Sequence, residues 1–252
     1  MVRETERPEE APGTMPIMYH LREMRDRIFR SAIAVIIGTA IAFVFCPQII
    51  GLLKAPAGDI ELQAIELVEN IAVFFKVALA GGIIISMPFL VYQVIAYIAP
   101  ALTPSEKRNV YRILPAVTVM FLGGVVFAYY VALPPALHFL QNFMSDIAEP
   151  QIRISNYINI VTRLIVSVGI VFETPIIIML LARMGLVSPQ WLAKRRRLWV
   201  VLSFIIAALI TPTFDPINQT IIALPLIILL ELSILLARLV YKKRGEEAPA
   251  ET

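Results

Sequence analysis

The sequence is poor in the side chains that build redox, metal and catalytic centres. It has a single cysteine, Cys46, so an internal disulfide is impossible, and its two histidines, His20 and His138, lie far apart. A lone cysteine and two distant histidines offer no ligand cluster, so we expect neither a metal nor another cofactor. The chain also lacks the glycine-lysine loop of nucleotide-binding proteins, the His-Glu-x-x-His zinc motif and the Gly-x-Ser-x-Gly nucleophile motif. An enzymatic function is therefore poorly supported.

Charge is also scarce, because only 16% of the 252 residues are charged while 58% are hydrophobic. Soluble domains are about half apolar, and the mean hydropathy of +0.77 places this chain well beyond them. A membrane-spanning helix needs roughly 20 mainly apolar residues. The sequence therefore predicts an all-α polytopic membrane protein with six transmembrane helices. The apolar segments are 31–45, 72–98, 113–133, 157–182, 198–210 and 217–236.

The segments divide the chain into a transmembrane domain, 20–241, and two tails. The first tail, 1–19, is polar, acidic and contains proline, so we expect it to be disordered rather than a cleavable signal. The second tail is 242–252. The distribution of cations predicts that both tails are cytoplasmic, because short cytoplasmic loops carry the excess of Lys and Arg. Eighteen of the 22 cations fall in the tails and even-numbered loops, and the four on the other side are Lys54, Lys76, Arg153 and Arg163.

Several segments are interrupted or short. Pro88, Pro115, Pro175 and Pro225 lie inside apolar segments, where each removes a backbone hydrogen bond, so we expect a kinked and cupped bundle. The fifth and sixth segments are separated by a tight turn, 211–216. We expect both of these helices to be short and to thin the bilayer locally. The two longer outer loops, 46–71 and 134–156, are large enough to cap a concave surface.

Glu173 lies inside an apolar run, 164–181, that is long enough to cross a bilayer. A carboxylate at that depth costs about 2.5–3.5 kcal/mol on insertion scales, so such residues usually serve a function. The alternative is a packing residue with a partner on a neighbouring helix, such as Gln93, Thr211 or Asn218. Pro175, two residues later, frees a carbonyl nearby and makes the site more polar.

Two further carboxylates lie in segments that should face the cytoplasm. Glu23 belongs to a stretch, 20–28, whose apolar residues recur at helical spacing, and it either binds a ligand or pairs with Arg27 one turn later. Glu106 lies in a short, proline-stiffened loop, where it either binds a ligand or caps the next helix.

An ordered set of motifs resembles the TatC family, the largest core subunit of the twin-arginine protein translocase. The set covers residues 19–238. It comprises His20-Leu21-x-Glu23-x-Arg25, Tyr92-Gln93-x-x-x-Tyr97-Ile98-Ala99-Pro100-Ala101-Leu102 with Glu106 following, Phe172-Glu173-x-Pro175, and Thr211-Pro212 with Asp215 and Gln219-Thr220.

The resemblance implies a specific function. TatC-like proteins have six helices in a cupped arrangement in the cytoplasmic (inner) membrane, with both termini cytoplasmic. They bind the twin-arginine signal peptides of folded proteins, together with a single-span TatB-type subunit. They then recruit TatA-type subunits in a process driven by the proton-motive force. The implied partners are therefore signal peptides, TatA- and TatB-type subunits, further copies in a multimeric complex, and the bilayer, with no nucleic acid.

The resemblance also assigns roles to residues. Those implied for signal-peptide binding are Glu23, Arg25, Glu106, Leu21 and Gln93; those for intramembrane or partner contacts are Glu173, Gln219 and Asp215; and those for the outer cap are Pro56 and Glu69. The stretch 67–71 departs from the family, which usually carries a proline and a phenylalanine around the glutamate that matches Glu69.

Two other functions remain open from the residues alone. An ion-coupled secondary transporter would use Glu173 as its coupling carboxylate, but it predicts internal repeats with matched broken helices, and none is found. A structural scaffold would instead bury Glu173 with its hydrogen bonds satisfied.

Overall fold

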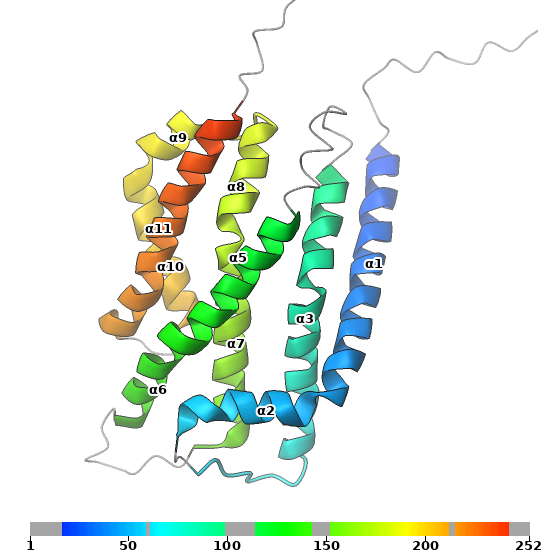
Figure 1. The fold of residues 1–252 in the computed structure, drawn as a ribbon, viewed down its shortest axis with the longest axis vertical. Coiled ribbons are helices and arrows are strands. Elements are labelled where there is room, and N and C mark those ends of the chain that lie inside the picture. The colour runs from blue at the N-terminus through cyan, green and yellow to red at the C-terminus, as the bar shows by residue number, and fades with distance from the viewer. Residues whose placement is uncertain (1–16, 59–60, 99–113, 143–151, 212–214, 242–252) are drawn as a thin grey trace, which may run out of the picture.

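In a computed structural model the chain forms a bundle of helices that cross from one end of the molecule to the other (Figure 1). The structure describes residues 17–58, 61–98, 114–142, 152–211 and 215–241. Within these ranges the only pairing of extended backbone is an isolated bridge between Gln63 and Arg153. The expected all-helical, six-segment membrane fold is confirmed.

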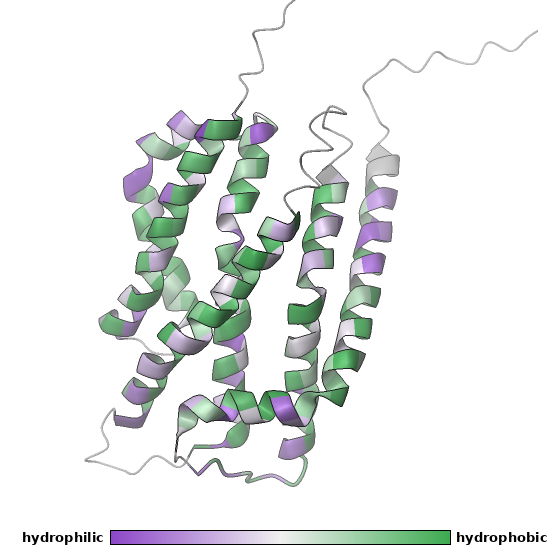
Figure 2. Ribbon diagram, in the orientation of Figure 1, coloured by the Kyte–Doolittle hydropathy of each residue, from purple (hydrophilic) through white to green (hydrophobic). Residues whose placement is uncertain are grey.

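The helices follow the order of the apolar segments. They are α1 (Ile17–Val44), α2 (Cys46–Lys54), a 3-10 turn (Ala55–Ala57), α3 (Glu69–Ile98), α5 (Leu114–Phe127), a π-helical turn (Ala128–Ala132), α6 (Leu133–Asn142), α7 (Ile154–Phe172), α8 (Thr174–Arg183), α9 (Pro189–Lys194), α10 (Arg196–Ile210) and α11 (Pro216–Val240). Apolar residues fill the middle of the helices and polar residues gather at their ends (Figure 2).

Five of the six crossings are long and apolar enough to span a bilayer within the described residues. The remaining crossing, α10, is the fifth along the chain and has 15 residues, which confirms that the fifth segment is short. The expectation of a short sixth helix is wrong, because α11 has 25 residues and continues through Glu231 to Val240. Within α11, Glu231 pairs with Arg196 of α10 (2.7 Å).

The third crossing also extends further than the sequence predicted. It continues from α5 through the π-helical turn into α6 and ends at Asn142, within the stretch expected to be an outer loop. Pro134 and Pro135 have no N–H groups to donate to the residues four positions earlier, which lie in the π-helical turn. The wider turn accommodates the two prolines, and the helix bends without ending.

The prolines expected to kink helices lie in different surroundings. Pro88 and Pro225 lie inside α3 and α11, and Pro175 lies at the junction where α7 gives way to α8. Pro115 lies at the edge of the described residues, next to the undescribed stretch before α5, so a kink there stays a prediction. Helix α2, which lies across the lower end of the bundle in Figure 1, was not expected from the sequence.

The close contact between α1 and α3 depends on small residues. Ala34, Gly38 and Ala42 of α1 recur every four residues, a pattern that lets transmembrane helices approach closely. A Cβ atom added to Gly38 would lie 2.6 Å from the carbonyl oxygen of Gly82, and one added to Gly82 would lie 2.5 Å from the backbone nitrogen of Thr39. Only glycine fits at these two positions.

Candidate functional site

The beginning of α1 and the last turns of α3 form a polar cluster at one end of the molecule. Arg27 donates to Glu23 through Nη2 (2.6 Å) and Nε (3.1 Å), and its Nη1 donates to Oε1 of Gln93 on α3 (3.3 Å). Gln93 is buried, while the side chains of Glu23 and Arg27 are about one-fifth exposed. The pairing of Glu23 with Arg27 one turn later, one of the two sequence interpretations, is therefore present. Glu23 and Gln93 also share one site.

The other residues expected at this site are not part of the cluster. Arg25 donates to Asp26 (2.9 Å) and its side chain is 74% exposed, so it points away from Gln93. Leu21 is half exposed and makes an apolar surface one turn before the cluster. Glu106 lies outside the described residues, and so do residues 99–102 of the same motif.

Glu173 is the one residue between α7 and α8, and its side chain is 1% exposed. Neither carboxylate oxygen has a hydrogen-bond partner among the described residues. The three partners considered from the sequence bond elsewhere, because Gln93 accepts from Arg27, Thr211 donates to Ala207 and Asn218 donates to Asp215. The structure therefore gives no support to Glu173 as a satisfied packing residue.

Proline and threonine produce the break at Glu173. Pro175 cannot donate to the carbonyl of Val171, four residues earlier, and the Thr174 hydroxyl donates to that oxygen instead (2.6 Å). The carbonyl of Glu173 accepts from the N–H groups of Ile176 and Ile177 and so starts α8. The local backbone is thus satisfied, whereas the carboxylate is not.

Apolar contacts lie on both sides of Glu173 along its helix face. One turn earlier, Gly169 lies against the ring of Phe121 on α5. One turn later, Ile176 belongs to a buried cluster with Ile95 of α3 and Val117 of α5. Residues three or four positions apart share a helix face, so the carboxylate lies on the side of α7 and α8 that packs against α5 and α3.

The residues expected for partner contacts at the α10–α11 turn bond within the chain. Asp215 caps α11 by accepting from the backbone N–H of Asn218 (2.8 Å) and from its side-chain amide (2.9 Å). Gln219 donates to the carbonyl of Phe204 on α10 (2.9 Å). On the other side of α10, Arg163 of α7 donates to the carbonyl of Leu209 (2.6 Å). These bonds hold the short α10 against its two neighbours.

Glu69 is the centre of the cap at the opposite end, where it begins α3 and is 3% exposed. Its carboxylate accepts from the backbone N–H groups of Ile65 (2.8 Å), Glu66 (3.3 Å) and Ser155 (3.1 Å). Arg153 pairs with both Glu66 (2.9 Å) and Glu69 (3.3 Å), and these hydrogen bonds raise the pKa of its guanidinium above the usual value. Glu69 therefore joins the start of α3 to the loop before it and to the start of α7, and its expected place in an outer cap stays a prediction.

Pro56, the second residue expected in the cap, lies beside contacts that the sequence did not predict. Pro56 lies in the 3-10 turn after α2, and the carbonyls just before that turn accept from two tyrosines. Tyr157 donates to Leu53 (2.7 Å) and Tyr129 donates to Leu52 (2.8 Å). Their pairing with α2 has no signal in the sequence, because the partners are backbone carbonyls 104 and 77 residues away.

The comparisons with known proteins agree with one another. Residues 19–225 match the family model described as "Sec-independent protein translocase protein (TatC)". The chain is 38% identical to the TatC protein of Aquifex aeolicus over 92% of its own length and 98% of that protein's, and 34% identical to that of Deinococcus radiodurans over 94% and 92%.

Solved structures show the same relationship. The "Crystal Structure of Twin Arginine Translocase Receptor- TatC" has a TM-score of 0.76 at 38% identity and covers 88% of this chain and 99% of the solved one. A second structure of that receptor, in DDM, has a TM-score of 0.77. The chain therefore belongs to the TatC family of Sec-independent protein translocase proteins, and it functions in protein translocation rather than in catalysis.

Proposed function

We propose that the chain is the signal-peptide receptor of a twin-arginine translocase and that the arginine pair docks beside Glu23. The observation that carries this proposal is the cluster of Glu23, Arg27 and Gln93, which holds a carboxylate at the membrane surface against an arginine. A site that already binds one guanidinium has the geometry to bind another. Bidentate contacts between arginine and carboxylate explain a preference for arginine over lysine.

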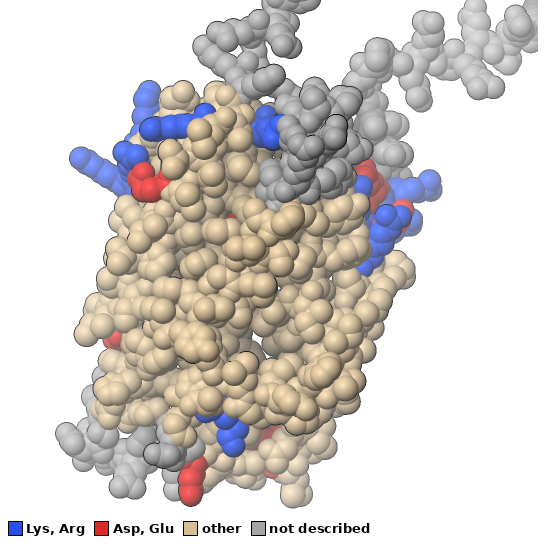
Figure 3. All heavy atoms as spheres, viewed as in Figure 1, with Lys and Arg blue, Asp and Glu red and all other residues tan. Residues whose placement is uncertain are grey.

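The charge distribution supports a cytoplasmic location for this cluster. Cations gather at the end of the molecule that contains the beginning of α1 and the end of α11, and a broad uncharged belt separates that end from the other (Figure 3). Because cytoplasmic ends carry the excess of Lys and Arg, both termini face the cytoplasm. The cap around Glu69 then faces the opposite side of the inner membrane.

Docking proceeds by exchange of arginines. A client guanidinium displaces Arg27 from Glu23, while Gln93 stays in place as a neighbouring acceptor. Glu106, in the loop after α3, supplies the second carboxylate for the arginine pair. The apolar part of the signal peptide then enters the membrane alongside the helices.

Glu173 contacts a partner after this docking step. Its two unsatisfied oxygens accept hydrogen bonds from a polar side chain on a single-span TatA- or TatB-type helix. The proton-motive force drives assembly of the multimeric complex. The short α10 offers an edge to equally short partner helices. Gln219 and Asp215 shape that edge through their bonds to Phe204 and Asn218.

Export of a folded reporter protein tests this function. The reporter carries a twin-arginine signal peptide, and the host cells have this chain as their only TatC-type protein. We expect Glu23→Gln together with Glu106→Gln to abolish export. Glu61→Gln is the control, because Glu61 is exposed on the outer side, and it should leave export unchanged. Full export by the double variant would overturn the docking site.

A further inference from the structure

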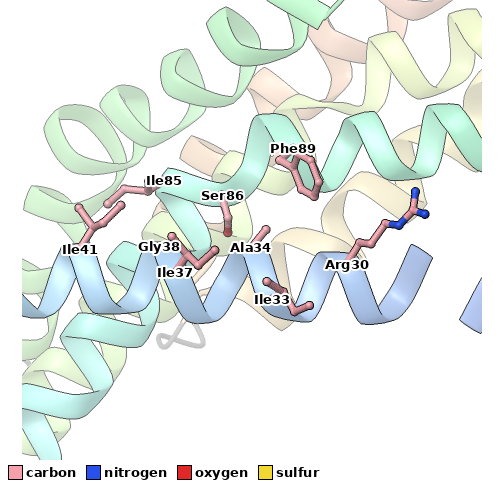
Figure 4. Close-up of a pocket in the computed structure, with 9 residues that line it drawn as sticks. All are labelled: Arg30, Ile33, Ala34, Ile37, Gly38, Ile41, Ile85, Ser86 and Phe89. Atoms are coloured by element: carbon pink, nitrogen blue, oxygen red, sulfur yellow. The ribbon is translucent and has the colours of Figure 1, made fainter. Parts of the chain in front are cut away.

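An apolar groove follows the contact between α1 and α3 on the outside of the bundle (Figure 4). Its volume is about 420 Å³, within the range of roughly 300–1,000 Å³ that is common for ligand sites. The residues that line it are Arg30, Ile33, Ala34, Ile37, Gly38, Ile41, Ile85, Ser86 and Phe89. From Ile41 to Arg30 it follows α1 for about 16 Å, at 1.5 Å per residue.

The groove exists because large and small side chains alternate around the helix contact. Ala34 and Gly38 form its floor where α1 approaches α3. Isoleucines of both helices and Phe89 form its walls, and these side chains are 41–56% exposed. The one hydroxyl in the lining, that of Ser86, donates to carbonyls of its own helix. The groove therefore offers an apolar surface to a hydrocarbon chain.

Arg30 closes one end of the groove with a positive charge. Its side chain is exposed and has no hydrogen-bond or ion-pair partner among the described residues. The acids on its own helix are engaged, because Asp26 accepts from Arg25 and Glu23 accepts from Arg27. On α3, Gln93 also accepts from Arg27, and Ser86 donates to its own helix.

The depth of Arg30 in the membrane decides which kind of anion can reach its guanidinium. The helix from Arg30 to Val44 rises only about 21 Å at 1.5 Å per residue, less than the hydrocarbon thickness of about 30 Å. The guanidinium therefore lies at the boundary between acyl chains and headgroups, where long basic side chains extend toward the surface. The phosphates of lipid headgroups lie at that depth.

We propose that the groove binds an anionic phospholipid, with one acyl chain against α1 and α3 and the phosphate on Arg30. A guanidinium binds phosphate in a bidentate manner, and basic sites between transmembrane helices on the cytoplasmic side bind anionic headgroups. With the proposed orientation, the lipid comes from the cytoplasmic leaflet. A partner helix is about 10–12 Å across with its side chains, so it fits the groove less well than one acyl chain does, and it would have to bring its own acid to Arg30.

Competition between two lipids on the purified full-length protein tests this site. The protein is delipidated in detergent and offered phosphatidylglycerol and phosphatidylcholine with the same acyl chains, and bound lipid is counted by native mass spectrometry. We expect a preference for phosphatidylglycerol of about fivefold, the ratio that corresponds to roughly 1 kcal/mol for a basic side chain at an anionic membrane surface.

Three variants make this result specific. Arg30→Gln should lose the preference, Arg30→Lys should keep most of it, and Ile37→Trp, which fills the groove from an exposed position, should reduce binding of both lipids. Arg22→Gln is the matched control, because Arg22 is an exposed cation of α1 that does not line the groove. An unchanged preference in Arg30→Gln, an equal loss in Arg22→Gln, or copurification of a helical partner that excludes lipid would overturn the proposal.

Discussion

At the scale of single residues, Glu173 is a buried carboxylate whose two oxygens have no hydrogen-bond partner among the described residues. Glu173 stands out because a carboxylate interrupts an apolar run, and burial confirms that it is enclosed. Its lack of a hydrogen-bond partner was not predictable, since each polar candidate on a neighbouring helix turns out to bond elsewhere. Arg25 was expected at the site because of its place in a motif. The motif could not reveal that its side chain points away from Gln93.

Glu173→Leu should stabilise the isolated protein. The buried carboxylate has two unsatisfied oxygens, and removing an unpaired buried polar group recovers about 1–3 kcal/mol. For a chain of this size that corresponds to a rise in melting temperature of about 2–6 °C. Thermal unfolding in detergent measures it.

The control for this prediction is Glu231→Leu. Glu231 is 47% exposed and pairs with Arg196 at the surface, so the expected change is below about 1 kcal/mol. The Glu173→Leu variant should also copurify with less of a TatB-type partner. A lower melting temperature than the wild type, with partner binding intact, would show instead that Glu173 is a satisfied structural residue.

At the scale of elements, hydrophobic runs and proline positions predicted the six crossings but not all of their ends. The third crossing continues past two prolines through a π-helical turn, and α11 continues to Val240 beyond the apolar segment. The π-helical turn is a feature that a linear pattern does not show. The close approach of α1 and α3 was equally hidden, because it depends on where two separate glycines meet.

Gly82→Val should separate α1 from α3. A Cβ atom at this position would meet the backbone nitrogen and Cα of Thr39 at 2.5 and 2.6 Å, and backbone atoms cannot move aside without shifting the helix. We expect a loss of several kcal/mol, in the range of overpacked cores or above it. The shift should also weaken signal-peptide binding, because it would move the acceptor Gln93 of α3 away from Glu23 of α1.

Gly123→Val on α5 is the matched control. A Cβ atom added there meets nothing within 4 Å, so thermal stability and peptide binding should stay close to those of the wild type. Equal stability of the Gly82 and Gly123 variants would contradict the close α1–α3 contact.

At the scale of the whole molecule, the count of Lys and Arg predicted a polarity that the structure makes visible. Cationic side chains cluster at one end, and the cap around Glu69 and Arg153 lies at the other. The architecture of that cap was not predictable from the sequence, because two tyrosines hold α2 in place by donating to its backbone carbonyls. The distribution of Lys and Arg is the only basis for placing this cap on one side of the membrane.

Cysteine labelling in intact cells tests the orientation. Leu67 is fully exposed in the loop before α3, and Arg238 lies in the last turns of α11. An impermeant maleimide should label the Leu67→Cys variant from outside and leave the Arg238→Cys variant unlabelled until the membrane is opened. The reverse pattern would invert the proposed topology.

The native thiol should not interfere with this measurement. Cys46 is buried and donates to the carbonyl of Phe74 (3.3 Å). Burial raises the pKa of its thiol above the usual value, so less of the reactive thiolate is present at neutral pH. The unmodified chain should therefore show little labelling even after the membrane is opened, and strong labelling would mean that α2 detaches readily.

The binding of a twin-arginine signal peptide tests the central claim most directly. The measurement is a double-mutant cycle on the purified protein, pairing Glu23→Gln with a peptide in which both arginines are lysines, and using Glu61→Gln as the control. We predict that Glu23→Gln weakens the arginine peptide about tenfold, or roughly 1.4 kcal/mol, and the lysine peptide much less. Equal losses for both peptides, or the same loss in Glu61→Gln, would contradict an arginine-binding site at Glu23.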